Sequence, residues 1–271
     1  MSIQRLQSHW AFTRMPFGRD LAPGMLHRHP GHGEAVARIT WCVDQRAIGV
    51  ITGEVGAGKT VAVRAAAAAL DPSRHVIIYL ANPTIGVRGM LGHVVAALGH
   101  TPAFHTASLA PQASEALATE HAERGRNPVL VIDESHLLDN HQLEAIRLLT
   151  NHEMDSGSPF AVVLVGQPTL RHRLRLGVLA ALDQRIAVRY TIAGMSAADT
   201  ADYIRHHCRI AGRDDTLFSD DATELIHNAS RGHPRAVNNL ALHALTAAFA
   251  ADHAIVDEKA ARIAISEIAA D

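Results

Sequence analysis

The chain has 271 residues, of which 48% are apolar, 19% are charged and 4% are aromatic, with a formal net charge of -2. This length suffices for one medium domain with a packed interior and a second, smaller domain. The balanced charge excludes a globally basic nucleic-acid-binding protein, so any such surface has to be local, and no apolar stretch approaches the ~20 residues of a membrane span.

The first forty residues show no regular periodicity. Proline and glycine recur in residues 16–18, 23–24 and 29–31, a composition typical of loops and turns. We therefore predict an irregular N-terminal segment over residues 1–40 that packs on the following core.

A glycine-rich loop at residues 53–60 follows the apolar run 47–51 and precedes the helix-forming run 61–70. The glycines let consecutive backbone N–H groups and the helix N-terminus point at one spot, where a lysine adds charge and a threonine hydroxyl can bind Mg²⁺. The alternative is a glycine-rich turn without a ligand, which the readable strand and helix on either side disfavour. The predicted nucleotide-binding residues are Gly53, Glu54, Val55, Gly56, Ala57, Gly58, Lys59, Thr60 and Val61.

Short apolar runs then alternate with helical patterns. The predicted strands are 75–80, 129–132, 160–165 and 185–192, and the predicted helices between them are 87–98, 109–125, 140–152 and 169–182. Such alternation is typical of an α/β fold with a parallel sheet and helices on both faces. We assign this pattern to an α/β domain over residues 41–192.

Helical periodicity alone continues after residue 192, over 196–211, 219–230, 234–251 and 257–269. Ser196, Ser219 and Asp257 stand where N-caps are expected. We predict a second, all-helical domain over residues 193–271.

Two carboxylates, Asp133 and Glu134, end the apolar strand 129–132. Asp133 is placed to reach a magnesium ion, and Glu134, one residue beyond, to orient and deprotonate an attacking water. Acidic residues at a strand end are a weak signal by themselves. Because a phosphate-binding loop precedes them in the same chain, the two patterns support each other.

Three further polar residues are candidates for the site because of their positions next to predicted strands and helices. Gln167 ends the strand 160–165, Arg185 precedes the last strand, and Arg235 begins a helix of the C-terminal part. An amide can hydrogen-bond a phosphate or water without adding charge, and arginines stabilise developing phosphoryl charge within a chain or from a neighbouring subunit. A turn-forming glutamine and solvated arginines are the alternatives.

The cysteines and histidines indicate in which compartment the protein is located and whether it has a metal site. Cys42 and Cys208 are far apart in a chain without a charged-then-apolar leader, which predicts free thiols and a cytoplasmic location. The chain has 19 histidines, but no zinc-type spacing occurs, and residues 206–208 are consecutive on a predicted helix and therefore diverge. His27, His29 and His32 lie among Gly and Pro, where loop contacts are expected in place of a metal cage.

With these residues in view, the chain resembles an AAA+ ATPase, a P-loop NTPase with a helical lid. Within that superfamily it is similar to the ExeA/GspA-like group and to the transposition helper ATPases (TnsC-, TniB- and IstB-like). The resemblance covers most of the chain and rests on residues 15–17, 52–60, 131–134, 143–151, 163–168, 184–186 and 232–239.

The resemblance implies a role for each motif. Residues 53–60 correspond to the Walker A loop, and Asp133 and Glu134 to the Walker B pair, with Ser135-His136 following where many relatives have Ala-Gln or Ala-His. Gln167 falls at sensor 1, Arg185 at the arginine finger that acts in trans, and Arg235 at sensor 2 on the lid. The implied activity is that of a hydrolase that converts ATP to ADP and phosphate with Mg²⁺ bound to Thr60 and Asp133.

The biological function expected from the resemblance is regulation of DNA transposition. An oligomer, a ring or a filament, would assemble on double-stranded DNA and recruit a transposase. A chain that ends at Asp271 without a membrane span or a periplasmic part favours this over an ExeA-type ATPase of secretion or envelope assembly. A nucleotide-gated binding switch with negligible turnover is a third possibility.

The expected DNA contacts are local. In similar proteins that encircle DNA, contacts come from the segment that corresponds to residues 82–90, where Arg88 is the strong charge. Arg171, Arg173 and Arg175 form a basic helix face, which equally fits phosphate contacts or an ordinary solvated surface.

Overall fold

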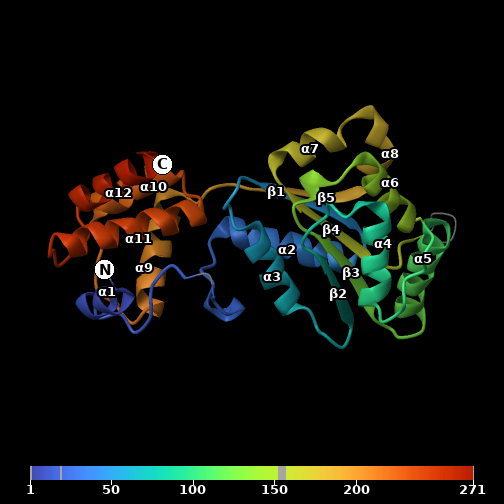
Figure 1. Cartoon of the computed structure of the whole chain (residues 1–271), viewed down its shortest axis with the longest axis horizontal. Coiled ribbons are helices and arrows are strands. Elements are labelled where there is room, and N and C mark those ends of the chain that lie inside the picture. The colour runs from blue at the N-terminus through green and yellow to red at the C-terminus, as the bar shows by residue number, and fades with distance from the viewer. Residues whose placement is uncertain (1, 19, 152–156, 271) are drawn as a thin grey trace. The chain divides into compact units, whose positions relative to one another are not determined.

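The computed structural model describes residues 2–18, 20–151 and 157–270. The chain divides into two compact units, whose elements are labelled in Figure 1. The α/β unit comprises His32–Val55 and Lys59–Ile192, and the helical unit comprises Met1–Gly31, Gly56–Gly58 and Ala193–Asp271. The tip of the glycine-rich loop therefore groups with the helical unit.

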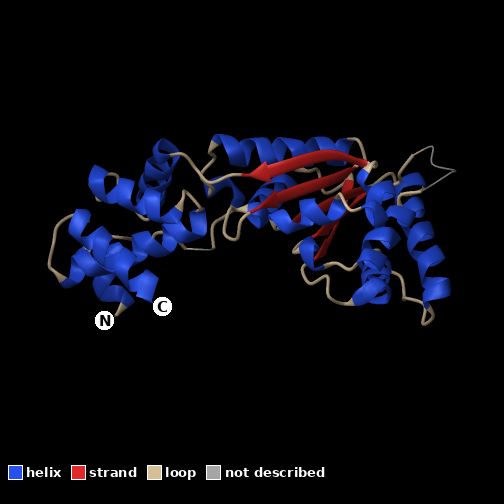
Figure 2. Ribbon diagram, turned by 90° about the horizontal axis from the view of Figure 1, so that it is seen from above, coloured by secondary structure: helices blue, strands red, loops and turns tan. Residues whose placement is uncertain are grey.

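A five-stranded parallel sheet forms the centre of the α/β unit (Figure 2). Its order is β2-β3-β4-β1-β5. Three strands, β3, β4 and β1, have neighbours on both sides. Every residue of β1 and β4 is buried, and so is every residue of β3 after the first, which explains their largely apolar sequence. The strands are β1 (Ile48–Gly53), β2 (His75–Leu80), β3 (Asn127–Ile132), β4 (Ala161–Gly166) and β5 (Ile186–Ile192).

Helices flank this sheet and close its core. They are α2 (Pro30–Asp44), α3 (Lys59–Ala69), α4 (Gly86–Ala97), α5 (Thr106–Ala122), α6 (Asn140–Leu149), α7 (Pro168–Leu174) and α8 (Ala180–Asp183), with 3-10 turns η2 (Ser135–Leu137) and η4 (Gly177–Leu179). The predicted parallel α/β class is confirmed. The predicted single helix over 169–182 is wrong, because the chain leaves the helix after Leu174 and η4 separates α7 from α8.

The helical unit contains α1 (Ile3–His9), the 3-10 turn η1 (Pro23–Met25), α9 (Ala197–Ile210), α10 (Asp220–Ser230), α11 (Pro234–Ala250) and α12 (Glu258–Ala270). The expected caps are confirmed for three of its helices, and Asp257 accepts from the N–H of Ala260 at the start of α12. Ser196 accepts from the N–H of Asp199 in a capping box with the Asp199 side chain, and Ser219 accepts from the N–H of Ala222. Its alanine-rich core lets α11 and α12 approach closely.

Residues 2–18 and 20–31 group with the helical unit, whereas the sequence predicts a segment over residues 1–40 that packs on the α/β core. Trp10, Phe12 and Phe17 are buried with side chains of α9 and α11. The N–H of Phe17 donates to Nδ1 of His207 at 3.2 Å, and the two rings stack with centroids 5.1 Å apart. Regular helices also form where an irregular segment was predicted, α1 and the start of α2.

Candidate functional site

The glycine-rich loop joins β1 to α3 directly, because β1 ends at Gly53 and α3 begins at Lys59. Gly56 and Gly58 have φ of 80° and 90°, a left-handed conformation that residues with a Cβ rarely adopt. The backbone of Gly58 also has open space on its Cβ side. These two glycines are therefore required by the path of the loop, as the sequence pattern predicted.

The side chain of Lys59 folds back over this loop. Its Nζ donates to the carbonyl oxygens of Gly53 at 2.8 Å and Glu54 at 2.9 Å, and only 8% of the residue is exposed. Carbonyl oxygens accept hydrogen bonds from an ammonium group, so these contacts hold the side chain against the loop. The arrangement presents one compact positive charge at the loop.

Thr60, in the first turn of α3, meets the end of β3. Its Oγ1 donates to Oδ2 of Asp133 at 2.7 Å, and the same oxygen accepts from the hydroxyl of Tyr79 at 3.0 Å. A hydroxyl and a carboxylate this close fit a hard cation such as Mg²⁺, which prefers oxygen ligands. The structure thus joins the two residues that the sequence pattern assigned to a metal.

Tyr79 was not predicted by sequence reasoning. It lies on β2, opposite Val131 of β3, and reaches Asp133 across the sheet edge. Burial, followed by the charge and hydrogen bond of Asp133, raises the pKa of Tyr79 to about 12, so the phenol stays a donor at neutral pH. The sequence signal that could have identified Tyr79 is its polar hydroxyl near the end of β2, the strand that pairs with β3.

Glu134 follows Asp133 with a left-handed backbone, φ 49° and ψ 34°. A non-glycine residue in this region stores strain that recurs at functional sites. Its side chain is 48% exposed, and Oε2 lies 3.3 Å from Nδ1 of His136. The carboxylate is accessible to solvent and directly follows Asp133 in the chain.

Gln167 follows β4 and is the N-cap residue of α7, although its side chain makes no capping hydrogen bond. Since β4 lies between β3 and β1 in a parallel sheet, the ends of these three strands share one edge. Gln167, Glu134 and the glycine-rich loop therefore emerge from the same edge, where open parallel sheets bind ligands.

The comparisons with known proteins agree with this geometry. Residues 43–174 match the family model described as "AAA domain". ORC2 from Aeropyrum pernix, solved as ADPNP-ADP complexes, has a TM-score of 0.66 at 19% identity and covers 93% of this chain and 70% of that chain. The RuvB Holliday junction branch migration motor of Thermotoga maritima has a TM-score of 0.56 at 18% identity, covering 86% and 68%.

The α/β unit has the P-loop AAA fold. Among curated proteins, general secretion pathway protein A of Aeromonas hydrophila is 35% identical over 251 residues. That match covers 91% of this chain and 46% of the relative, so the chain spans about half the length of the curated relative.

Arg185 lies at the other edge of the AAA sheet. It immediately precedes β5, and its Nη1 donates to Oγ1 of Thr150 at the C-terminus of α6, at 3.4 Å. Strand N-termini and C-termini lie at opposite edges of a parallel sheet, so the α/β unit does not bring Arg185 to the Thr60–Asp133 pair of its own chain. A role at a phosphate requires another copy.

Arg235 stands in the first turn of α11 in the helical unit. Its backbone N–H donates to the carbonyl of Gly56, in the loop tip of the same unit, at 3.3 Å. A neighbouring turn is held by Gly232, with φ 68°, whose carbonyl accepts from the N–H of Met195 at 2.9 Å. The start of α11 is thereby fixed beside the glycines of the loop tip.

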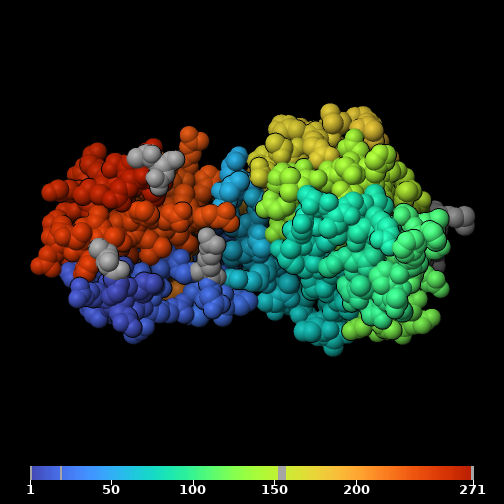
Figure 3. All heavy atoms as spheres, viewed as in Figure 1, coloured from blue at the N-terminus to red at the C-terminus, as the bar shows by residue number. Residues whose placement is uncertain are grey.

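The arginines considered for DNA contacts differ in their surroundings. Arg88 is exposed, stacks over the ring of Phe104 at 5.3 Å and donates to the Phe104 carbonyl at 3.0 Å. Arg171 and Arg175 are exposed on the segment that Figure 3 shows in yellow on the surface. Arg173 instead donates to the carbonyl of His136 and to Asn140. Of the predicted basic face, Arg171 and Arg175 are exposed, whereas the guanidinium of Arg173 is bound within the protein.

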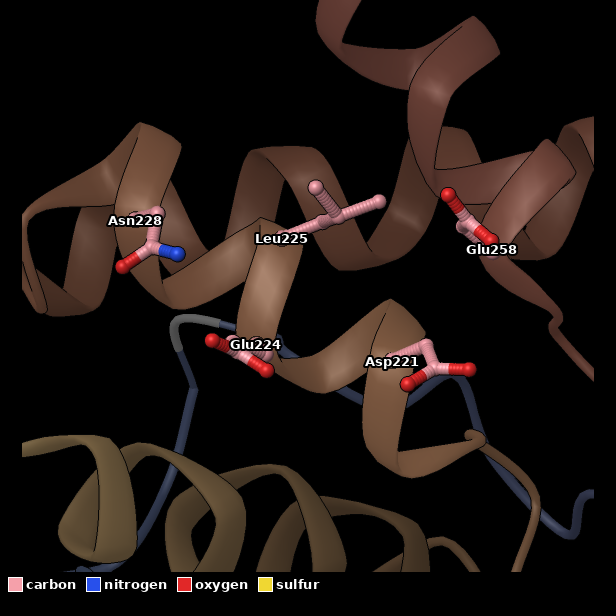
Figure 4. Close-up of a pocket in the computed structure, with 5 residues that line it drawn as sticks. All are labelled: Asp221, Glu224, Leu225, Asn228 and Glu258. Carbon is pink, nitrogen blue, oxygen red and sulfur yellow. The ribbon is translucent and has the colours of Figure 1, made fainter.

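The helical unit has a hollow of its own. The hollow in Figure 4 is within the helical unit and is lined by Asp221, Glu224, Leu225, Asn228 and Glu258, none of which was predicted as a site residue. Within residues 2–18, 20–151 and 157–270, no group of three or more His, Cys, Asp or Glu side chains is arranged to hold a metal ion.

Burial governs the titration of Cys42, Cys208 and His207. Cys42 and Cys208 are free and buried, and burial raises the pKa of each thiol to about 12. Burial, with nearby His206, His27 and Arg14, lowers the pKa of His207 to about 3. No helix in the described part of the chain combines the length and apolar character needed to span a membrane.

Proposed function

We propose that this chain binds and hydrolyses ATP at the edge of the sheet formed by the glycine-rich loop, Asp133 and Glu134. The observation that supports this most strongly is the 2.7 Å hydrogen bond from Thr60 to Asp133, which joins the phosphate-binding loop to the end of β3. A loop that served only as a turn would not require the Thr60 hydroxyl, in the first turn of α3, to lie next to the buried carboxylate of Asp133.

Each group of residues at this site has a distinct role in the proposed reaction. Backbone N–H groups of residues 56–60 and the Lys59 ammonium bind the phosphates. Thr60 and Asp133 hold Mg²⁺, which supplies charge neutralisation at the phosphates when bound. Glu134 accepts the proton of the attacking water, and Gln167 orients that water or a phosphate oxygen by hydrogen bonding.

Hydrolysis is proposed to occur between copies of the chain. Arg185 lies at the sheet edge opposite to Thr60 and Asp133, so the arginine reaches a phosphate only in a neighbouring subunit. A head-to-tail contact of this kind generates a ring when the rotation closes and a filament when it does not. Arg235 of the helical unit is proposed to sense the nucleotide beside the loop tip.

For the biological process, we propose a secretion or envelope assembly ATPase of the ExeA/GspA type. The support is the 35% identity to general secretion pathway protein A over 91% of this chain. The sequence motifs favour regulation of transposition, which this relative does not support. Drosophila ORC bound to DNA shares the fold at 18% identity, TM-score 0.66, covering 99% of this chain and 66% of that chain, a likeness that concerns architecture alone.

The decisive experiment separates binding from hydrolysis. Glu134→Gln keeps the side-chain shape but cannot take a proton, so it should bind ATP with wild-type affinity and lose phosphate release by ~10²-fold or more. Glu115→Gln, an exposed glutamate of α5, is the matched control. Wild-type turnover in Glu134→Gln would show that another group activates the water.

A second measurement addresses the process. ATP hydrolysis should be insensitive to double-stranded DNA, and deletion of the gene should impair export of secreted proteins. Strong stimulation of turnover by duplex DNA together with normal export would favour the transposition regulator.

A further inference from the structure

The turn that carries Glu134 has a fixed backbone. Oγ of Ser135, a fully buried residue, donates to the carbonyl of Ile132 at 2.7 Å, and the N–H of Leu137 donates to the carbonyl of Glu134 at 2.8 Å. The end of β4 lies directly against the turn, since a Cβ on Gly166 would be 3.1 Å from the backbone nitrogen of His136. The direction in which the Glu134 side chain leaves the backbone is therefore set.

The position of the Glu134 carboxylate depends on its own side-chain torsions, because the carboxylate is half exposed. His136 is the neighbour that can restrict them. Its ring is 13% exposed, and Nδ1 lies 3.3 Å from Oε2 of Glu134. This nitrogen is buried and makes no hydrogen bond within the described residues, so a small side-chain movement is enough to complete one to the carboxylate.

Arg173 holds the backbone of His136. Its Nη1 donates to the carbonyl of His136 at 2.8 Å, and Nη2 donates to Oδ1 of Asn140 at 3.2 Å. Both bonds come from a charged donor and are stronger than neutral ones. Arg173 lies on α7, six residues after Gln167, so the same helix that begins at Gln167 also holds the turn of Glu134.

We propose that His136 is a positioning residue for Glu134 and that Arg173 holds His136 in place. The proposal rests on the proposed function, in which Glu134 takes the proton of the attacking water. A general base works only within hydrogen-bond reach of that proton, and a displacement of about 1 Å lowers the rate strongly. His136 limits the half-exposed carboxylate to the arrangement that faces the site.

The kinetic test compares His136→Ala with His136→Gln. His136→Ala should lower kcat by about 10- to 100-fold while KM and the Kd for ATP stay unchanged, because only the base is misplaced. The amide of His136→Gln donates from a similar place and should restore most of the rate. His141→Ala, an exposed histidine of α6, is the control and should match the wild type.

Arg173→Ala should reproduce the fall in kcat in part, and His172→Ala, an exposed neighbour on α7, should have no effect. A wild-type kcat in His136→Ala would overturn the proposal, as would a rise in KM at constant kcat. Equal losses in His136→Ala and His136→Gln would also overturn it, because they would indicate a packing role.

A turnover-independent measurement keeps the two proposals distinguishable. In protein labelled with ¹⁵N-histidine, Glu134→Gln should shift the Nδ1 resonance of His136, which is assigned by its loss in His136→Gln, and leave that of His141 unchanged. Absence of this shift would overturn the pairing even if ATP is hydrolysed. Absence of wild-type hydrolysis would contradict the proposed function and the positioning role, and the shift would then report the contact alone.

Discussion

Lys59→Ala tests the phosphate-binding loop most directly. The ammonium of Lys59 lies on the loop carbonyls of Gly53 and Glu54, at 2.8 and 2.9 Å, in a residue that is 8% exposed. A hydrogen bond to a charged group contributes about 1.5–3 kcal/mol. At 1.4 kcal/mol for each factor of ten, its loss should raise the Kd for ATP about 10- to 150-fold.

The assay is calorimetric titration with ATP in a Glu134→Gln background, which prevents turnover. The chain contains only two lysines, Lys59 and Lys259, and Lys259 is exposed on α12. Lys259→Ala is therefore a matched control. The same fact permits an NMR readout, since ¹⁵N-lysine labelling gives two Nζ signals, of which ATP should shift only that of Lys59.

An ATP affinity in Lys59→Ala within about twofold of the control would refute the reasoning, given that the expected loss is at least about tenfold. A shift of the Lys259 signal in place of the Lys59 signal would place the nucleotide elsewhere. Thermal unfolding without ATP should be similar in both variants, which shows that a loss of binding does not reflect unfolding.

Three further outcomes are expected. Tyr79→Phe removes the hydroxyl that donates to Asp133 at 3.0 Å and should raise the Mg²⁺ concentration for half-maximal turnover about 2- to 10-fold; an unchanged titration curve contradicts the role. Arg185→Ala should keep ATP binding and lose ~10³-fold in turnover, and mixing with Lys59→Ala should restore part of it, unless the site is completed within one chain. The pKa of His207 is about 3 in the folded protein and 6.5 for an ordinary histidine. Between pH 3 and 6.5 the His207 side chain is therefore protonated in the unfolded chain and neutral in the folded one. The free energy of unfolding should therefore fall as pH drops from 6.5 towards 3, and His207→Asn should flatten that dependence in urea titrations.

The α/β class and the loop could be predicted because their signals are local. Strands β1 and β4 have neighbours on both sides, so their apolar sequence is continuous, and Gly56 and Gly58 are required by left-handed backbone torsions. A carboxylate one residue beyond a buried strand is likewise visible in sequence. These features depend on a few consecutive residues, and local sequence determines them.

The partners of those residues were decided by the tertiary structure. Tyr79 meets Asp133 across 54 positions of sequence because β2 pairs with β3, and Arg173 reaches the carbonyl of His136 across 37 positions because α7 packs on the turn after β3. Residue patterns show that each segment has a buried face or a polar tip. They do not show which other segment it meets.

The N-terminal segment shows the same limit. The sequence predicts that this segment packs on a core, and its aromatic side chains Trp10, Phe12 and Phe17 are buried. Their burial in the helical unit depends on specific contacts, such as the hydrogen bond from Phe17 to His207 at a separation of 190 residues. Hydrophobic burial is non-directional, so the apolar character of a segment predicts that it packs, and only the surfaces available in three dimensions decide against which element.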